Sequence, residues 1–205
     1  MSEDPASSMG TPRRSSGAGG VTRLTDELNL EIQLVDGAWN AIGVDPEQLA
    51  RKSVTATLAA TACLDHLPKL PARFEVGVRF TDDQEMRRLN TVYREIDGST
   101  NVLAFPVSAS FEDLAAEVQR VAPGGILGLG DVVLARQTIC REAEAAGKPF
   151  GDHLCHLIVH GVLHLLGFDH DKAKEAKKME ALEIEILKSL GIANPYDETR
   201  TRKND

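Results

Sequence analysis

The sequence predicts an α+β fold in which helices cover a small mixed sheet of about four strands. The chain has 205 residues, of which 42% are hydrophobic, and this suits one compact domain with its own core. The apolar pattern switches between a period of two and a helical period in the order β-α-β-α-β-β-α-α-α. No internal repeat is visible, which excludes a solenoid or propeller.

The first two thirds of the chain contain six expected elements. In order, they are a strand over 30–35, a helix over 46–65, a strand over 73–81, a helix over 82–94, and strands over 100–107 and 129–135. The first strand alternates Leu30, Ile32 and Leu34 with polar residues, which is typical of a half-buried strand. Pro46 suits a first helical turn, and Thr81 is the expected N-cap of the next helix. The long loop between the last two strands is expected to include a short helix near 112–118.

Three helices complete the domain, and a glycine follows each of them. They are expected over 136–146, 151–166 and 172–190, before Gly147, Gly167 and Gly191. Residues 1–22 are rich in Ser, Gly and Pro, so they are expected to form a disordered tail. Residues 193–205 are polar and are expected to form a flexible C-terminal tail. A single catalytic domain then spans 23–192.

Composition excludes several classes of protein. The sequence has no apolar run long enough to cross a membrane and no secretory signal, so we expect a cytoplasmic protein without a membrane partner. The spacing of Cys63, Cys140 and Cys155 favours neither a disulfide framework nor a thiolate zinc site. The net charge of −8 argues against a broad basic surface for nucleic acid, but it leaves room for a locally basic site.

The stretch "HGVLHLLGFDH", residues 160–170, predicts a metal site. His160 and His164 are four residues apart in a helix, so their side chains lie on one face. Gly167 can end that helix in a left-handed conformation and turn His170 back toward the pair. Three neutral histidines with a fourth position left for chemistry are the composition of a catalytic zinc site. We expect one Zn²⁺ per chain, although nickel and other late first-row ions also suit imidazole ligands.

Two nearby residues are candidates for orienting the ligands without binding the metal. His156 lies on the same helical stripe, but about 12 Å along the axis from His164, which is too far for a shared ion. Asp169 could accept a hydrogen bond from a ligating imidazole, because the second ring nitrogen usually donates to a carboxylate or carbonyl. An ordinary turn carboxylate is the alternative for Asp169.

Gly161 restricts the chemistry of this site. The spacing H-x-x-x-H-x-x-G-x-x-H is that of metzincin proteases, but those enzymes carry Glu directly after the first His, as the base. Gly161 occupies that position here, which argues against cleavage of peptide bonds. Phosphodiester hydrolysis remains compatible, since a metal and a positioned cation together stabilise charge on a phosphoryl group.

Longer motifs add a family resemblance. "VHGVLHLLGFDH", with "GDVVLA" and "LNTVYREIDGSTNVLAFP" before it, closely resembles the YbeY family of bacterial rRNA maturation factors, from about Glu75 to Leu190. The resemblance implies a zincin-like histidine helix, metal ligands at His160, His164 and His170, and a functionally important arginine at Arg94. It also implies metal-dependent, single-strand-specific endoribonuclease activity at the 3′ end of 16S rRNA, with a role in ribosome quality control and contacts to ribosomal components.

The chain departs from the family pattern at two places. The run "REIDGST" lacks the two lysines that are usual there, and Ala104 replaces the usual serine before Phe-Pro. The three histidines are unaffected. The departures weaken the expectation that this loop contributes to RNA affinity.

The leading hypothesis is therefore a zinc-dependent RNA hydrolase in which Arg94 and His164 carry the catalytic roles. The planar guanidinium of Arg94 matches two phosphate oxygens; an ion pair with Glu95 or Asp97 is its structural alternative. Two other functions stay open: a ribosome-assembly binding protein whose zinc is structural, and a metallopeptidase, which Gly161 disfavours. The oligomeric state also stays open.

Overall fold

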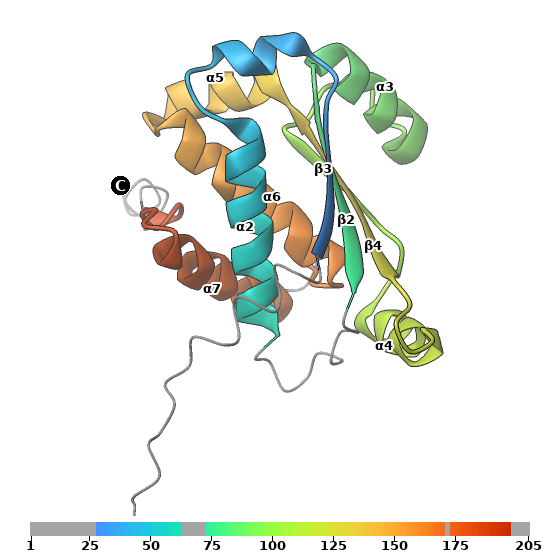
Figure 1. Cartoon of the computed structure of the whole chain (residues 1–205). Helices are drawn as coiled ribbons and strands as arrows, with labels where there is room; N and C mark the ends of the chain where they lie inside the picture. Colours follow the sequence, from blue (N-terminus) through green and yellow to red (C-terminus); the bar gives the residue numbers. More distant parts are fainter. Residues whose placement is uncertain (1–27, 63–72, 171–172, 198–205) are drawn as a thin grey trace, which may run out of the picture.

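A four-stranded mixed sheet forms the centre of the molecule (Figure 1). The computed structural model describes residues 28–62, 73–170 and 173–197. The strands are arranged in the order β1-β2-β4-β3, with bounds Leu28–Leu34, Phe74–Thr81, Leu127–Ala135 and Val102–Pro106 respectively. The first three are parallel, and β3 is antiparallel to β4 at the sheet edge. This confirms the predicted α+β class and the mixed sheet.

Alternation along β4 divides the core between the two faces of the sheet. Val132 and Leu134 belong to the main hydrophobic cluster, whereas Val133 joins a smaller cluster on the other face with Leu103 and Met86. Successive side chains of a strand point to opposite faces, so each face needs its own cover. Two helices cover the main face, α2 (Pro46–Thr61) and α6 (Phe150–Leu165), and α7 (Ala173–Ser189) packs against both of them.

The opposite face carries α3 (Asp83–Arg94), whose N-cap is Asp82 and not the predicted Thr81. The Asp82 carboxylate accepts a hydrogen bond from the Glu85 N–H at 2.8 Å. Thr81 is still paired in β2, and its carbonyl accepts a hydrogen bond from the indole of buried Trp39 at 2.9 Å. The strand thus ends at Thr81, as predicted, and the capping role passes to the next residue, Asp82.

The remaining elements follow the predicted order with one addition. The short helix of the long loop is α4 (Phe111–Arg120), and α5 (Arg136–Ala146) has the predicted bounds. The addition is a 3₁₀ turn, η1 (Gly37–Ala41), which is too short to show a helical apolar period. The predicted end of the first helix, at 65, and the predicted tail over 1–22 lie outside the described residues.

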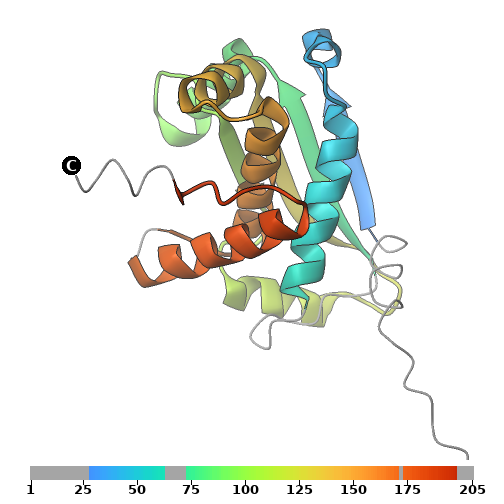
Figure 2. The same ribbon diagram turned by 90° about the vertical axis from the view of Figure 1, so that its left-hand side faces the viewer.

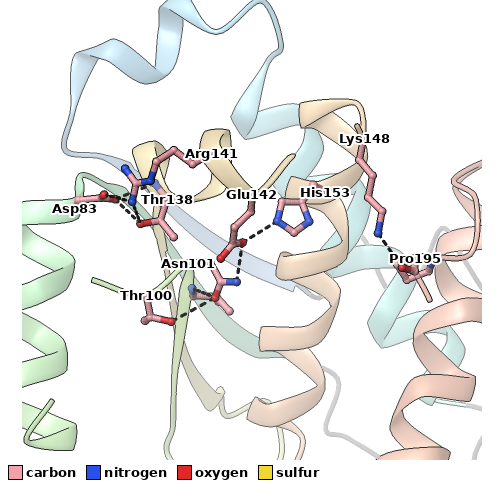
Figure 3. A network of polar contacts seen from close by, with 10 residues as sticks. Asp83, Thr100, Asn101, Thr138, Arg141, Glu142, Lys148, His153 and Pro195 are labelled. Atoms are coloured by element: carbon pink, nitrogen blue, oxygen red, sulfur yellow. Dashed lines mark hydrogen bonds and ion pairs between the residues drawn. The ribbon is translucent and has the colours of Figure 1, made fainter. Parts of the chain in front are cut away.

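A polar network fixes the start of α6 against its neighbours (Figure 3). Glu142 of α5 accepts hydrogen bonds from the Asn101 amide and from His153 of α6, both at 2.9 Å. Asp83 at the start of α3 accepts from the Thr138 N–H and hydroxyl, each at 2.9 Å. His153 is thus engaged in joining α5 to α6.

The described part of the chain after α7 makes specific contacts with the domain. Residues 193–197 fold back over the helical side of the molecule (Figure 2), and the Pro195 carbonyl accepts a hydrogen bond from Lys148 Nζ at 2.8 Å. In the part of the chain that the structure describes, no helix is both long and apolar enough to cross a membrane.

Candidate metal centre

The middle of α6 presents two histidines side by side. His160 and His164 lie one turn apart, and their rings have centroids 4.6 Å apart. Their Nε2 atoms are 3.2 Å from each other. Two ligands of a tetrahedral zinc ion at about 2.0–2.1 Å would be separated by about 3.3 Å. The helix therefore supplies two nitrogen atoms at the spacing of a shared ion.

The turn after α6 brings in the third histidine, as predicted. Gly167 has a φ of +82°, and the Phe168 N–H bonds the Leu163 carbonyl at 3.1 Å, which ends the helix. Phe168 is buried and packs edge-on against Phe111 of α4, with centroids 5.0 Å apart. The His170 ring then lies 5.6 Å from His160 and 5.0 Å from His164 by centroid. One nitrogen from each of the three histidines falls within 4.8 Å of the others.

We expect Gly167→Ala to damage this centre more than a comparable substitution elsewhere. A left-handed backbone costs an alanine about 1–2 kcal/mol. At Gly167 the added Cβ would also lie 2.9 Å from the Phe111 nitrogen. The turn should shift, lowering both the free energy of unfolding in urea and the zinc affinity measured by chelator competition.

Gly43→Ala is the matched control for this prediction. Gly43 has a φ of +81° and nothing within 4 Å of an added Cβ, so only the backbone cost applies. Its zinc affinity should equal that of the wild type. Equal zinc affinity in both variants would show that the Gly167 turn does not set the position of His170.

Glu183 of α7 is the functional residue that the sequence analysis missed. Its side chain is 1% exposed, and Oε1 accepts a hydrogen bond from His160 Nδ1 at 2.7 Å. Because a carboxylate only accepts, His160 Nδ1 is the donor of this hydrogen bond, and Nε2 is the ring nitrogen that faces the cluster. A signal was present in the sequence: Glu183 lies on the apolar stripe of α7 with Met179, Ile186 and Leu187. A charged residue within such a stripe indicates a buried partner.

The pKa values of these groups favour metal binding at neutral pH. Burial and the neighbouring His160 and His170 lower the pKa of His164 to about 4, so its imidazole is neutral. Burial alone would raise the pKa of Glu183, but hydrogen bonds from His156 and His160 outweigh it and lower the pKa to about 2. A neutral His164 imidazole and an ionised Glu183 carboxylate are the protonation states that suit a metal ion and its outer partner.

His156 and Asp169 both lie beside the cluster. His156 Nε2 is 3.2 Å from Glu183 Oε2, so His156 contacts the carboxylate that orients His160. Asp169 Oδ1 accepts a hydrogen bond from the backbone N–H of His170 at 2.6 Å. His156 thus contacts the carboxylate partner of a cluster histidine, whereas this Asp169 contact is with the backbone of the turn. Within the described ranges, His160, His164 and His170 form the only group of three or more possible metal-binding side chains.

Gly161 has a packing role that explains the absence of a glutamate. It is buried where α6 crosses β4, and an added Cβ would lie 2.7 Å and 3.0 Å from the two Val132 methyl groups. The side chain of any other residue would point into the sheet. The position after the first histidine therefore cannot supply a base to this centre without moving the helix.

Comparisons with known proteins agree with this geometry. The model of a family described as "Endoribonuclease YbeY" matches residues 41–191. The chain belongs to the YbeY family. Curated relatives named "Endoribonuclease YbeY" include one from Dinoroseobacter shibae, 46% identical over 82% of this chain and 90% of its own length. Another, from Alkalilimnicola ehrlichii, is 47% identical over 82% of this chain and 91% of its own length.

A solved structure shares the YbeY fold of this chain. It is the solution structure of TM1509 from Thermotoga maritima, which matches with a TM-score of 0.51 and 21% sequence identity. The match covers 85% of this chain and 93% of that one. At this identity the likeness is one of fold.

Arg94, the arginine singled out by the YbeY motif, is the last residue of α3. It is exposed, and within the described residues it forms no ion pair. Asp97 instead accepts two hydrogen bonds from Arg87, at 2.6 Å and 2.9 Å, so the alternative of an Arg94–Asp97 pair is wrong. The structure brings the three histidines together, but Arg94 ends α3, the helix on the opposite face of the sheet from α6. The preceding residue, Tyr93, packs edge-on against Phe105 of the edge strand β3.

The altered YbeY loop, residues 94–100, is held by its own contacts. Glu95 ends α3 with a φ of 59°, and Asn90 Nδ2 donates a hydrogen bond to the Gly98 carbonyl at 2.8 Å. Ala104 lies in β3 on the side facing the main core. The two departures from the family pattern therefore leave the local backbone supported.

Proposed function

We propose that this chain is a metal-dependent endoribonuclease that hydrolyses phosphodiester bonds in single-stranded rRNA. The proposed substrate is the 3′ end of 16S rRNA, with ribosomal components as partners, in the cytoplasm and in ribosome quality control. Membership in the YbeY family supports the reaction class. The observation that carries the proposal is the convergence of three imidazole nitrogens within 4.8 Å, backed by a buried carboxylate.

The residues present fit a zinc ion with one position left for chemistry. His160, His164 and His170 would hold it, and Glu183 orients the first of them through Nδ1. When bound, a divalent ion of this kind polarises a phosphoryl oxygen and activates water. His170 is exposed, so RNA approaches the centre from its side.

The role proposed for Arg94 is to bind the phosphodiester. Its guanidinium is always charged, and it presents parallel N–H donors to two phosphate oxygens. Since Arg94 ends the helix on the opposite face of the sheet from α6, the RNA strand would pass over the edge of the sheet to contact both Arg94 and the histidines.

We expect Arg94→Ala to lower single-turnover cleavage of a single-stranded RNA by about ten- to a hundredfold, since a charge-assisted hydrogen bond contributes about 1.5–3 kcal/mol. Arg94→Lys should recover only part of this loss, because an ammonium cannot bind two oxygens in parallel. Zinc content should not change in either variant.

Arg88→Ala is the control for the Arg94 substitutions. Arg88 lies on the same helix and its side chain is 69% exposed; among the described residues, its one ion pair is with Glu85, at 3.6 Å. Its loss should leave cleavage unchanged. If Arg94→Ala cleaves RNA at the wild-type rate, Arg94 has no role in the reaction and the site consists of the histidine centre alone.

The experiment that tests the function combines elemental analysis with an RNase assay on the same purified sample, with and without chelator. Cleavage that disappears on metal removal and returns with zinc is the expected result. Metal removal that unfolds the protein, with no cleavage by the loaded form, would favour the structural-zinc binding protein. Chelator-sensitive digestion of a peptide library would favour the metallopeptidase.

A further inference from the structure

We propose that the segment after α7 is part of the metal centre, and that Tyr196 is a positioning residue that acts on His160 through Glu183. The inference rests on the metal site of the proposed function. Tyr196 lies beyond residues 41–191, which match the family model. It therefore adds a residue to the site from outside the matched motif.

Two hydrogen bonds connect Tyr196 to a metal ligand. The Tyr196 hydroxyl donates to Glu183 Oε2, and the other oxygen of the same carboxylate accepts from His160 Nδ1 at 2.7 Å. The Tyr196 ring also packs edge-on against His156, with centroids 5.6 Å apart and planes at 82°. The hydroxyl is thus held where it contacts the carboxylate.

The backbone around Tyr196 is anchored on both sides. Lys148 Nζ donates to the Pro195 carbonyl at 2.8 Å (Figure 3), and Pro195 is buried. Asn194 Oδ1 accepts from the Tyr196 N–H at 3.0 Å, and Asn194 Nδ2 donates to Asp197 at 2.7 Å. These contacts form a local turn that fixes the position of the tyrosine ring.

The buried Glu183 carboxylate is charged, so it needs hydrogen-bond donors; Tyr196 is the third, after His160 and His156. Its Oε2 is shared by Tyr196 and His156, and the His156 contact is the longer of the two histidine contacts, 3.2 Å against 2.7 Å. Without the tyrosine hydroxyl, Oε2 would depend on that longer bond. The carboxylate would then be free to rotate between the two imidazoles, and the His160 ring would lose its fixed orientation. Outer partners of ligating histidines commonly affect metal affinity by about 10–100-fold.

The test compares zinc affinity in full-length Tyr196→Phe and Tyr93→Phe proteins by competition with a chelating dye. Tyr93 is the other tyrosine of the chain and is 65% exposed on α3. Tyr196→Phe should weaken zinc binding by about tenfold, at the lower end of the range for outer partners, and Tyr93→Phe should not change it. Lys148→Met, which releases Pro195, should weaken binding in the same direction by a smaller factor.

Two further measurements separate positioning from stability. Urea unfolding of the metal-free proteins measures stability alone, and ¹⁵N NMR of the His160 ring reports which nitrogen carries the proton. The wild type should show a proton on Nδ1, and Tyr196→Phe should show a mixture of tautomers. Lower stability of Tyr196→Phe with unchanged zinc affinity and unchanged tautomer would overturn the inference.

The inference and the proposed function fail in different ways. A chain that binds zinc with the expected dependence on Tyr196, but cleaves no RNA, would contradict the function alone. An active nuclease whose zinc affinity is the same with Phe at position 196 would contradict the inference alone. A wild-type protein that takes up no zinc would overturn both the inference and the metal dependence.

Discussion

Replacing His164 by alanine is expected to remove the metal and, with it, the cleavage of RNA. His164 supplies the nitrogen that lies 3.2 Å from that of His160, and its ring centroid lies 5.0 Å from that of His170. Two remaining imidazoles, one of them exposed, do not form a catalytic zinc site. Zinc affinity and the single-turnover rate should each fall by more than about a hundredfold, the upper value for loss of an outer partner.

His153→Ala is the matched control on the same helix. His153 bonds Glu142 at 2.9 Å and belongs to the network at the start of α6, so its loss should leave the zinc content at one ion per chain. Circular dichroism of both metal-free variants checks that each is folded. Wild-type cleavage by a folded, metal-free His164→Ala protein would place the nuclease site elsewhere on the molecule.

Gly161→Glu, which restores the protease motif H-E-x-x-H, is expected to unfold the protein without creating a peptidase. The new Cβ would lie 2.7 Å from a Val132 methyl group, and the carboxylate would be forced among buried apolar side chains. Overpacking together with an unpaired buried charge is expected to cost more than about 4 kcal/mol. The measurement is the free energy of unfolding in urea, with a peptide-library digestion on any folded fraction.

Two substitutions calibrate the Gly161→Glu result. Gly161→Ala adds only the crowded Cβ, so we expect a loss of about 1–3 kcal/mol from overpacking, reduced by the better helix propensity of alanine. Gly151→Glu places the same side chain in the first turn of α6, where an added Cβ meets only side chains at 3.6 Å and an acid favours the helix dipole. A stable Gly161→Glu protein that hydrolyses peptides would show that the glycine was not required by packing.

The fold was predictable from the sequence to the extent that its signals are local. The helix over 136–146 and the glycine turns after the last three helices follow from periodicity and capping within a few residues. The 3₁₀ turn near Trp39 was not predictable, because its stability comes from contacts with Phe80 and the Thr81 carbonyl across the sheet. The order of strands, with β3 antiparallel at the edge, is likewise a property of the assembled sheet.

The position of the turn at Gly167 was predicted from the sequence, but its direction depends on a tertiary contact. A glycine after the helix indicates that the chain turns, and the structure confirms the left-handed φ. The direction of the turn is set by Phe168, which packs against Phe111 of a helix more than fifty residues earlier in the chain. That contact brings His170 to the other two histidines.

By itself, the sequence determined which three histidines come together, because the four-residue spacing of His160 and His164 and the glycine before His170 act within eleven residues of helix and turn. The sequence also showed that Gly161 occupies the position of the glutamate in the protease motif. Only the tertiary structure decided what surrounds the ligands. The Glu183 carboxylate is 23 residues from His160, and Tyr196 is 40 residues from His156, so no local period connects them. Packing of α7 and of the segment after it against α6 brings these groups together, since a buried carboxylate is stable only where several donors converge on it.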